Sequence, residues 1–205
     1  MTTPPSSPST EIADVSKPKP RILLLHSSHD TINEMGVVAQ DYDCELVGVD
    51  SIEAALEALR AANTSGKYFT SVVFDKALPN TKEDAEKHAK LFAEQLAVAV
   101  QTIDDAEHDR SSVGRIPNDA ERISLRAENL RTERTMNPNG GDAFITACLE
   151  DDLLAHTQCV QCEPTSISKG NATALGEKMN FLPVSWIETV FEGAIAALKG
   201  GHGKD

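Results

Sequence analysis

SVVFDKALPN, residues 71–80, is the stretch of sequence that decides the fold. Its first four residues are suited to a strand that runs into Asp75, and a Leu-Pro turn follows. A lone carboxylate at the end of a strand can be a chemical site, or it can accept hydrogen bonds from the turn that follows it. The choice between these two roles depends on the elements that surround Asp75.

Two more strands precede this stretch, and helices separate them. RILLLHSS is a short apolar run typical of a strand that is buried on both faces. The expected order of strand, helix, strand, helix and strand comprises residues 21–28, 29–43, 44–51, 52–63 and 68–75. This alternation predicts an α/β fold with a parallel sheet and right-handed crossovers. Chemistry in such sheets gathers beyond the carboxyl ends of the strands, where His26, Ser27 and Asp75 lie.

Short polar residues mark the starts of these helices. We expect Asp30 to cap the first helix, and Asp50 or Ser51 to cap the second. The second helix carries an apolar face, which consists of Ile52, Ala55, Leu56 and Leu59.

The pattern changes after Pro79, and residues 81–139 contain no convincing strand. Residues 81–108 carry apolar side chains at a spacing of three and four, which predicts a helix. Residues 119–135 predict a second, more polar helix, and together the two form an expected helical hairpin. This charged segment is either a solvated arm or an interaction surface, and the sequence leaves both interpretations open.

The chain then returns to alternating strands and helices, so residues 21–200 form one expected domain with residues 81–139 inserted in it. The later elements are a helix at 142–156, a strand at 157–162, a weak helix at 166–176, a strand at 178–182 and a helix at 184–200. Residues 1–20 are rich in Pro, Ser and Thr and predict a disordered tail. Residues 201–205 are expected to form a flexible C-terminus.

Composition limits the kinds of partner that the protein can have. The chain has 205 residues, is 40% hydrophobic and carries a formal net charge of -13, which suits one core beneath an acidic surface. Such a surface repels phosphate backbones and anionic membranes, so we expect no nucleic-acid and no membrane partner. No apolar run approaches the roughly 18 residues that a membrane span needs. The N-terminus has no basic segment that leads into an apolar one, so we expect a cytoplasmic protein.

The four cysteines do not suggest a disulfide framework. Cys159 and Cys162 form a C-x-x-C, which suits a redox pair, half of a metal site or a buried strand. A zinc site needs about four ligands, and no second cluster stands at a suitable spacing. Residues three apart on a strand also point to opposite faces, so we favour the buried strand. The six histidines show no metal-binding spacing, and we expect no cofactor.

In their order and spacing, these motifs resemble the receiver domain of two-component response regulators. VVFDKALPN is similar to the phosphoacceptor strand of that family, a hydrophobic run followed by Asp-x-x-Leu/Met-Pro. RILLLHSS resembles the first strand, CELVGVDSIEAALEALRAA the second strand and helix, GGDAFITACLEDDLLAHTQCVQC the third helix and fourth strand, and GEKMNFLPVSWIETV the closing elements. The resemblance implies a flavodoxin-like, doubly wound sheet of five parallel strands in the order 2-1-3-4-5. It also implies that the helical hairpin is inserted after strand 3, beside Asp75.

The resemblance assigns the phosphoacceptor position to Asp75. Receivers hold Mg²⁺ with an acidic pair after the first strand, but His26 and Ser27 occupy those two positions here. Neither side chain is a good Mg²⁺ ligand, and the negative charge of the pair is lost. Lys76 is near Asp75 in sequence and can neutralise it.

Two further positions of the receiver site also depart from the family. The Ser/Thr that binds the phosphoryl group falls on Glu163, or on Thr165 if the alignment slips by two residues. The lysine falls on Leu182 or Pro183, so no lysine occupies its position. A carboxylate and two apolar residues neither bind nor neutralise a phosphoryl group.

A competing alignment places the end of the fourth strand at FITA, residues 144–147, and makes Thr146 the phosphoryl-binding residue. CEP, residues 162–164, would then stand where the family has Lys-Pro. We disfavour it because it leaves KMNFLP unused and the interval from Thr146 to Glu163 is short for a helix.

We therefore expect a non-enzymatic, receiver-like signalling module that has lost Mg²⁺-dependent phosphoacceptor chemistry. Its partner would be a signalling protein, for example a kinase or another regulator, and a homodimer is one form that the contact could take. The candidate interaction residues are Phe92, Leu96, Val100 and Trp186. Two alternatives stay open. One is an atypical receiver that is phosphorylated on Asp75, and the other is a flavodoxin-like small-molecule binder or enzyme that uses the same crevice.

Overall fold

A computed structural model describes residues 18–108, 135–183 and 186–200, and its centre is a parallel sheet of five strands. The strands are β1 (Arg21–Leu25), β2 (Glu45–Val49), β3 (Ser71–Phe74), β4 (Cys159–Cys162) and β5 (Met179–Phe181). Their order across the sheet is β2-β1-β3-β4-β5, and every neighbouring pair is parallel. This confirms the predicted flavodoxin-like, doubly wound fold.

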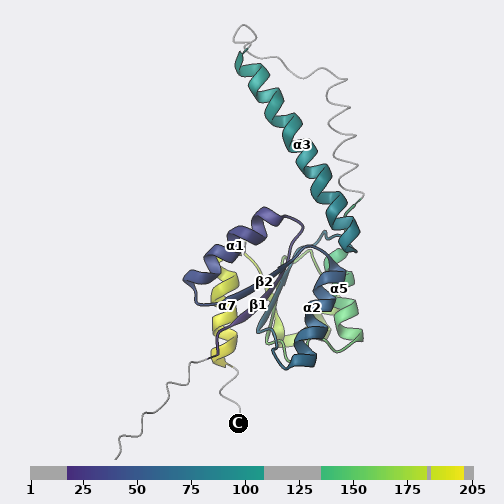
Figure 1. The fold of residues 1–205 in the computed structure, drawn as a ribbon. Coiled ribbons are helices and arrows are strands. Elements are labelled where there is room, and N and C mark those ends of the chain that lie inside the picture. Colours follow the sequence, from purple (N-terminus) through teal and green to yellow (C-terminus); the bar gives the residue numbers. More distant parts are fainter. Residues whose placement is uncertain (1–17, 109–134, 184–185, 201–205) are drawn as a thin grey trace, which may run out of the picture.

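Helices cover both faces of the sheet (Figure 1). The helices of the described residues are α1 (His29–Asp41), α2 (Ile52–Ser65), α3 (Lys82–His108), α5 (Gly140–Glu150), α6 (Lys169–Leu175) and α7 (Trp186–Gly200). A 3-10 turn, Gly176–Lys178, leads into β5. Helices α1 and α7 pack on one face, and α2, α5 and α6 pack on the other. None of these helices is long and apolar enough to cross a membrane.

The alternation of side chains along the strands builds these two layers. In β1, Leu23 and Leu25 belong to the cluster under α2 and α5, whereas Ile22 and Leu24 belong to the cluster under α1 and α7. All four are at most 1% exposed, as a parallel strand covered on both faces requires. The continuous apolar run of RILLL is therefore explained by burial on both sides.

Serine residues cap the first two helices. The Ser51 hydroxyl accepts the N–H of Ala54, which agrees with one of the two predicted caps of α2. The prediction of Asp30 as the cap of α1 is wrong, because Ser28 is the N-cap and its hydroxyl accepts the N–H of Thr31. The chain turns into α1 two residues earlier than the position of Asp30 requires.

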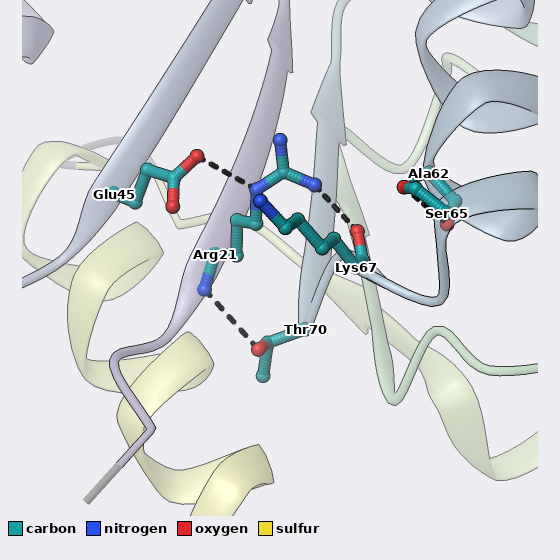
Figure 2. A network of polar contacts seen from close by, with 6 residues as sticks. All are labelled: Arg21, Glu45, Ala62, Ser65, Lys67 and Thr70. Carbon is teal, nitrogen blue, oxygen red and sulfur yellow. Dashed lines mark hydrogen bonds and ion pairs between the residues drawn. The ribbon is translucent and has the colours of Figure 1, made fainter. Parts of the chain in front are cut away.

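The amino ends of β1, β2 and β3 are tied together by Arg21 (Figure 2). Its guanidinium pairs with Glu45 on β2 at 2.7 Å and donates to the carbonyl of Lys67, before β3. Its backbone N–H donates to the Thr70 hydroxyl at 3.2 Å. Contacts to the sheet begin one residue before the predicted start, since Pro20 is buried and its carbonyl accepts the N–H of Glu45. These contacts hold the three strands together at their amino ends, opposite the carboxyl edge of the sheet.

Helix α3 rises from the loop after β3 and points away from the sheet (Figure 1). It spans the first helix of the predicted insertion, while residues 109–134, with most of the second predicted helix, lie outside the described residues. Leu78 and Asn137 exchange two backbone hydrogen bonds and so close the base of the insertion. The first turn of α3 is tied to α2, because the Lys82 N–H donates to the Glu53 carboxylate.

Candidate functional site

The centre of the candidate site is a contact between His26 and Asp75 at the carboxyl edge of the sheet. Leu25, the last residue of β1, lies opposite Phe74, the last residue of β3. The next residue on each strand is therefore brought alongside the other. His26 Nε2 lies 3.0 Å from Asp75 Oδ2. Both residues lie at the carboxyl edge, where the sequence places them, and the structure adds the contact between their side chains.

The hydrogen bonds of His26 define its protonation. The backbone N–H of Ser28 donates to Nδ1 at 2.9 Å, so Nδ1 carries a lone pair and no proton. This geometry assigns the proton to Nε2, which donates to Asp75. His26 is then neutral, and its contact with Asp75 is a hydrogen bond to a carboxylate rather than a pair of opposite charges.

Trp186, at the start of α7, covers the other side of the imidazole. The two rings stack with centroids 6.2 Å apart and planes 11° from parallel. The His26 side chain is 17% exposed, whereas that of Asp75 is 40% exposed. Trp186 is the single tryptophan of the chain, so its fluorescence reports on this site.

No hydrogen bond or ion pair of the described residues joins the remaining receiver-like positions to Asp75, although Glu163 follows Cys162, which lies opposite Phe74 in the sheet. Ser27 is half-buried after β1, and Glu163 is exposed and opens the tight turn that closes with the N–H of Ser166. Leu182 packs into the cluster under α1 and α7, and its N–H continues the ladder to β4. Pro183 is exposed beyond it.

Two lysines near these positions in sequence also fail to replace the missing one. Lys178 lies at the opposite edge of the sheet, where its ammonium donates to the carbonyls of Leu154 and Ala155. Lys76 forms no ion pair with Asp75, contrary to the expectation from its sequence position. Within the described ranges, the side chain that contacts the Asp75 carboxylate is that of His26.

The competing alignment is contradicted by the structure. Thr146 lies inside α5, where its hydroxyl donates to the carbonyl of Asp142 at 2.9 Å. The fourth strand is Cys159–Cys162, which leaves Glu163 or Thr165 at its carboxyl end. Because β5 is Met179–Phe181, the unused KMNFLP stretch and the short interval from Thr146 to Glu163 both argue correctly against this alignment.

The C-x-x-C motif is a buried strand. Cys159 and Cys162 are free thiols in β4, and both are at most 1% exposed. Burial raises the pKa of the Cys162 thiol to about 12, so it stays protonated at neutral pH. In the described part of the chain, no three His, Cys, Asp or Glu side chains are arranged to hold a metal ion.

Of the proposed interaction residues, Phe92 and Trp186 lie on different elements, α3 and α7. Phe92 lies on α3 with 51% of its surface exposed, and its ring stacks on His88. Trp186 is half-buried against His26 at the sheet. Leu96 and Val100 are on α3, but their side chains lie outside the described part of the structure.

Sequence reasoning missed a polar pocket beside this site. It has a volume of about 210 Å³ and lies between the loop after β3, the start of α5 and the loop after β4. The lining residues are Lys76, Asn139, Asp142, Thr165, Ser166, Ile167 and Ser168. A side chain at position 141 would lie 2.6 Å from the Asp75 carbonyl and 2.8 Å from that of Ser166, so Gly141 permits this close approach. The glycine pair of GGDAF is the signal that could have located it.

Asp142 holds one wall of this pocket in place. Its Oδ1 accepts the N–H of Ser168 at 2.7 Å and the side-chain amide of Asn171 at 2.8 Å. The hydrogen bond from the Ser168 backbone lowers the pKa of Asp142, which is therefore ionised at neutral pH. The carboxylate thereby joins the start of α5 to the start of α6.

Comparisons with known proteins add little to this description. No protein-family model matches the chain, and no curated protein matches it significantly. Among solved structures, it is similar to the signal receiver domain of a protein assigned as a Luxo repressor from Vibrio parahaemolyticus, with 12% identity and a TM-score of 0.43. That match covers 89% of this chain and 92% of the other. The fold assignment therefore rests on the strand order of the sheet itself.

Proposed function

We propose that this chain is a receiver-like signalling module that binds a protein partner and has lost Mg²⁺-dependent phosphoacceptor chemistry. The observation that supports this most directly is the hydrogen bond from neutral His26 to Asp75. It joins the position of the family's acidic pair to the position of its phosphoacceptor. The carboxylate is thus occupied by a donor where a receiver has a metal.

The chemistry of an aspartyl phosphate explains why this substitution matters. Mg²⁺ needs oxygen ligands, and a developing phosphoryl charge needs a metal or lysine to neutralise it. His26 presents an N–H to the site, and its Nδ1 lone pair is used by Ser28. Leu182 and Pro183 supply no cation, and Glu163 adds a negative charge after β4. Each of these residues disfavours transfer of a phosphoryl group to Asp75.

The same hydrogen bonds argue against a hydrolytic role for the crevice. A general base needs a ring nitrogen with a free lone pair within reach of its nucleophile. Both ring nitrogens of His26 are engaged, one as an acceptor from Ser28 and one as a donor to Asp75. We therefore extend the proposal to a protein without enzymatic activity.

The surface through which such a module acts is the arm formed by α3. The arm follows the loop after β3 and points away from the sheet (Figure 1), and it exposes Phe92, so it offers an apolar contact there. The net charge of -13 favours a partner with a basic surface over one with an acidic surface. A signalling kinase, another regulator or a second copy of the chain fits this description, and a cytoplasmic location is part of the proposal.

A second candidate function is an atypical receiver that is phosphorylated on Asp75. The observation that favours it is the exposure of the Asp75 side chain, 40% of which solvent reaches. A phosphoryl donor could approach the oxygen that His26 does not use.

Phosphorylation chemistry separates the two candidates. We expect no Mg²⁺-dependent labelling of the wild-type chain by acetyl phosphate, measured by intact-protein mass spectrometry. A variant that combines His26→Asp, Ser27→Asp, Glu163→Thr and Leu182→Lys restores the acidic pair, the phosphoryl-binding residue and the lysine, and its labelling shows that the assay detects a competent site. Labelling of the wild type that requires Mg²⁺ and disappears in Asp75→Asn would sink the proposal and support the atypical receiver.

A further inference from the structure

The polar pocket beside Asp75 includes Thr165, the alternative phosphoryl-binding position, but it has no part in the contact between His26 and Asp75. It opens at the carboxyl edge of the sheet between β3 and β4, and neither His26 nor Asp75 lines it. Ligands of open α/β sheets bind at this edge. Its volume of about 210 Å³ suits a molecule of a few heavy atoms.

The pocket contains one charge of each sign. Lys76 and Asp142 are the charged residues among those that line it. They are not joined by an ion pair within 4 Å, and no hydrogen bond or ion pair of the described chain uses the Lys76 ammonium. The Oδ1 atom of Asp142 accepts hydrogen bonds from Ser168 and Asn171, which leaves Oδ2 for another partner. A cation and an anion thus face one small space without neutralising each other.

Uncharged polar groups in the same walls also lack partners. Ser166 is 2% exposed, and its hydroxyl is buried without a hydrogen bond in the described structure. A buried hydroxyl without a partner costs about 1–3 kcal/mol, a cost that a polar ligand reaching this wall of the pocket would remove. The side-chain amide of Asn139 forms no cap for α5, although it stands at the N-cap position. The pocket therefore presents several donors and acceptors for a polar ligand.

We propose that this pocket binds a small zwitterion of amino-acid size, with its carboxylate on Lys76 and its ammonium on Asp142. A ligand with a single negative charge pairs with Lys76 but is repelled by Asp142. A ligand with a single positive charge pairs with Asp142 but is repelled by Lys76. A zwitterion satisfies both residues at once. The hydroxyl of Ser166 and the amide of Asn139 then select for polar substituents.

Such a ligand would tie together the segments at the base of the arm. The N–H of Gly141 already donates to the carbonyl of Lys76, which links the loop after β3 to the start of α5. A ligand held by Lys76 and Asp142 adds a second link between the same segments. This inference does not rest on the proposed loss of phosphorylation, since the pocket shares no residue with the His26–Asp75 contact.

Binding can be tested with the full chain and a panel of glycine, L-alanine and L-serine. We expect saturable shifts of the backbone amide signals of residues 165–168 in ¹H–¹⁵N spectra, at micromolar to millimolar ligand. N-acetyl-L-serine lacks the ammonium and L-serinamide lacks the carboxylate, so each should bind roughly tenfold or more weakly than L-serine. Inorganic phosphate is the comparison ligand for a simple anion site.

Matched variants locate the site. Lys76→Met removes a side chain without a partner in the fold, and it should weaken L-serine binding by roughly tenfold or more while leaving the unfolding curve unchanged. Lys169→Met, which removes a lysine outside the pocket, should bind as the wild type does. The proposal is overturned if no amino acid of the panel gives saturable shifts, if phosphate binds more tightly than L-serine, or if Lys76→Met binds normally.

Discussion

At the scale of single residues, His26 decides what Asp75 can do. The sequence predicts that both lie at the carboxyl edge of the sheet, because strand ends in a parallel sheet meet there. It does not predict the direction of the hydrogen bond between them. That direction follows from the N–H of Ser28, which points at Nδ1 only because the chain turns into α1 at this residue.

The strength of this contact can be measured with a double-mutant cycle. We expect His26→Ala and Asp75→Ala to show a coupling of about 1 kcal/mol in the free energy of unfolding, as is typical of one partly exposed hydrogen bond. Urea unfolding monitored by circular dichroism provides the four values. Additivity of the two single substitutions within a few tenths of a kcal/mol would show that the contact is not formed in solution.

For the pocket, the glycine pair of GGDAF is the sequence signal, but it does not show which residues line the space. Asp142, Ser166 and Lys76 carry no periodic signal, and they meet because the start of α5 approaches two strand ends closely. That approach depends on the absence of a side chain at Gly141. A single sequence shows the glycine but not which backbone lies above it.

At the scale of elements, apolar periodicity predicted the strands and most helices correctly. The predicted helix at 142–156 is shorter, because α5 ends at Glu150 and the chain continues through turns in which Asp152 has a φ of 51°. Leu153 and Leu154 remain buried after the helix ends, which explains why their spacing imitates a longer helix. The sequence alone does not distinguish apolar residues that are buried in turns from apolar residues that lie on the buried face of a helix.

Two glycines inside helices should respond to alanine in opposite ways. In α7, a Cβ on Gly193 would lie 2.0 Å from the amide nitrogen of Gln161, which is 1% exposed and has no solvent to move into. We expect Gly193→Ala to lower the free energy of unfolding by about 1–3 kcal/mol. In α1, a Cβ on Gly36 meets nothing within 4 Å, so Gly36→Ala should raise the free energy of unfolding by about 0.5–1 kcal/mol.

Urea unfolding of both variants tests this contrast. Gly193→Ala combined with Gln161→Val should recover most of the lost stability, because the second substitution removes the clash and the unpartnered Gln161 oxygen. Stabilisation by Gly193→Ala alone would contradict the packing of α7 on β4.

The hydrogen bonds of the Asp142 carboxylate, which join α5 to α6, should make the stability of the fold depend on pH in the acidic range. The pKa of Asp142 lies below its ordinary value of 3.8 in the folded chain, because Ser168 and Asn171 donate to the carboxylate. A lowered folded pKa means that this stabilisation is complete above pH 3.8 and is lost as the pH falls through the folded pKa. We expect Asp142→Asn to reduce the slope of stability against pH below about 4, as measured by thermal unfolding. An unchanged slope would show that the carboxylate is not bound in this way.

At the scale of the whole molecule, the described chain is a sheet domain from which helix α3 rises as an arm (Figure 1). The predicted position of the insertion follows from the resemblance, since the family passes directly from the Pro79 turn to the GGDAF helix. The way in which its base is closed could not be predicted. It depends on the paired backbones of Leu78 and Asn137 and on the approach of Gly140 to Leu78.

This closed base implies that the arm can be removed. We expect replacement of residues 83–134 by a short Gly/Ser linker to leave a folded domain, with the free energy of unfolding changed by no more than about 2 kcal/mol. The variant keeps the Leu78–Asn137 pair but loses buried Ala85 and the His88–Thr135 hydrogen bond. Circular dichroism and urea unfolding measure the outcome, and loss of the cooperative transition would show that the arm is part of the core.

Mg²⁺ binding at Asp75 is the most direct measurement of whether the receiver chemistry is lost. Titration of the full chain with Mg²⁺ can be followed through Trp186 fluorescence and the ¹⁵N signals of the His26 ring, which lie against the carboxylate. We expect both signals to stay unchanged up to millimolar Mg²⁺, with the proton of His26 on Nε2. A saturable change in both signals that is absent in Asp75→Asn would show that the metal displaces His26, and it would contradict the proposed loss of function.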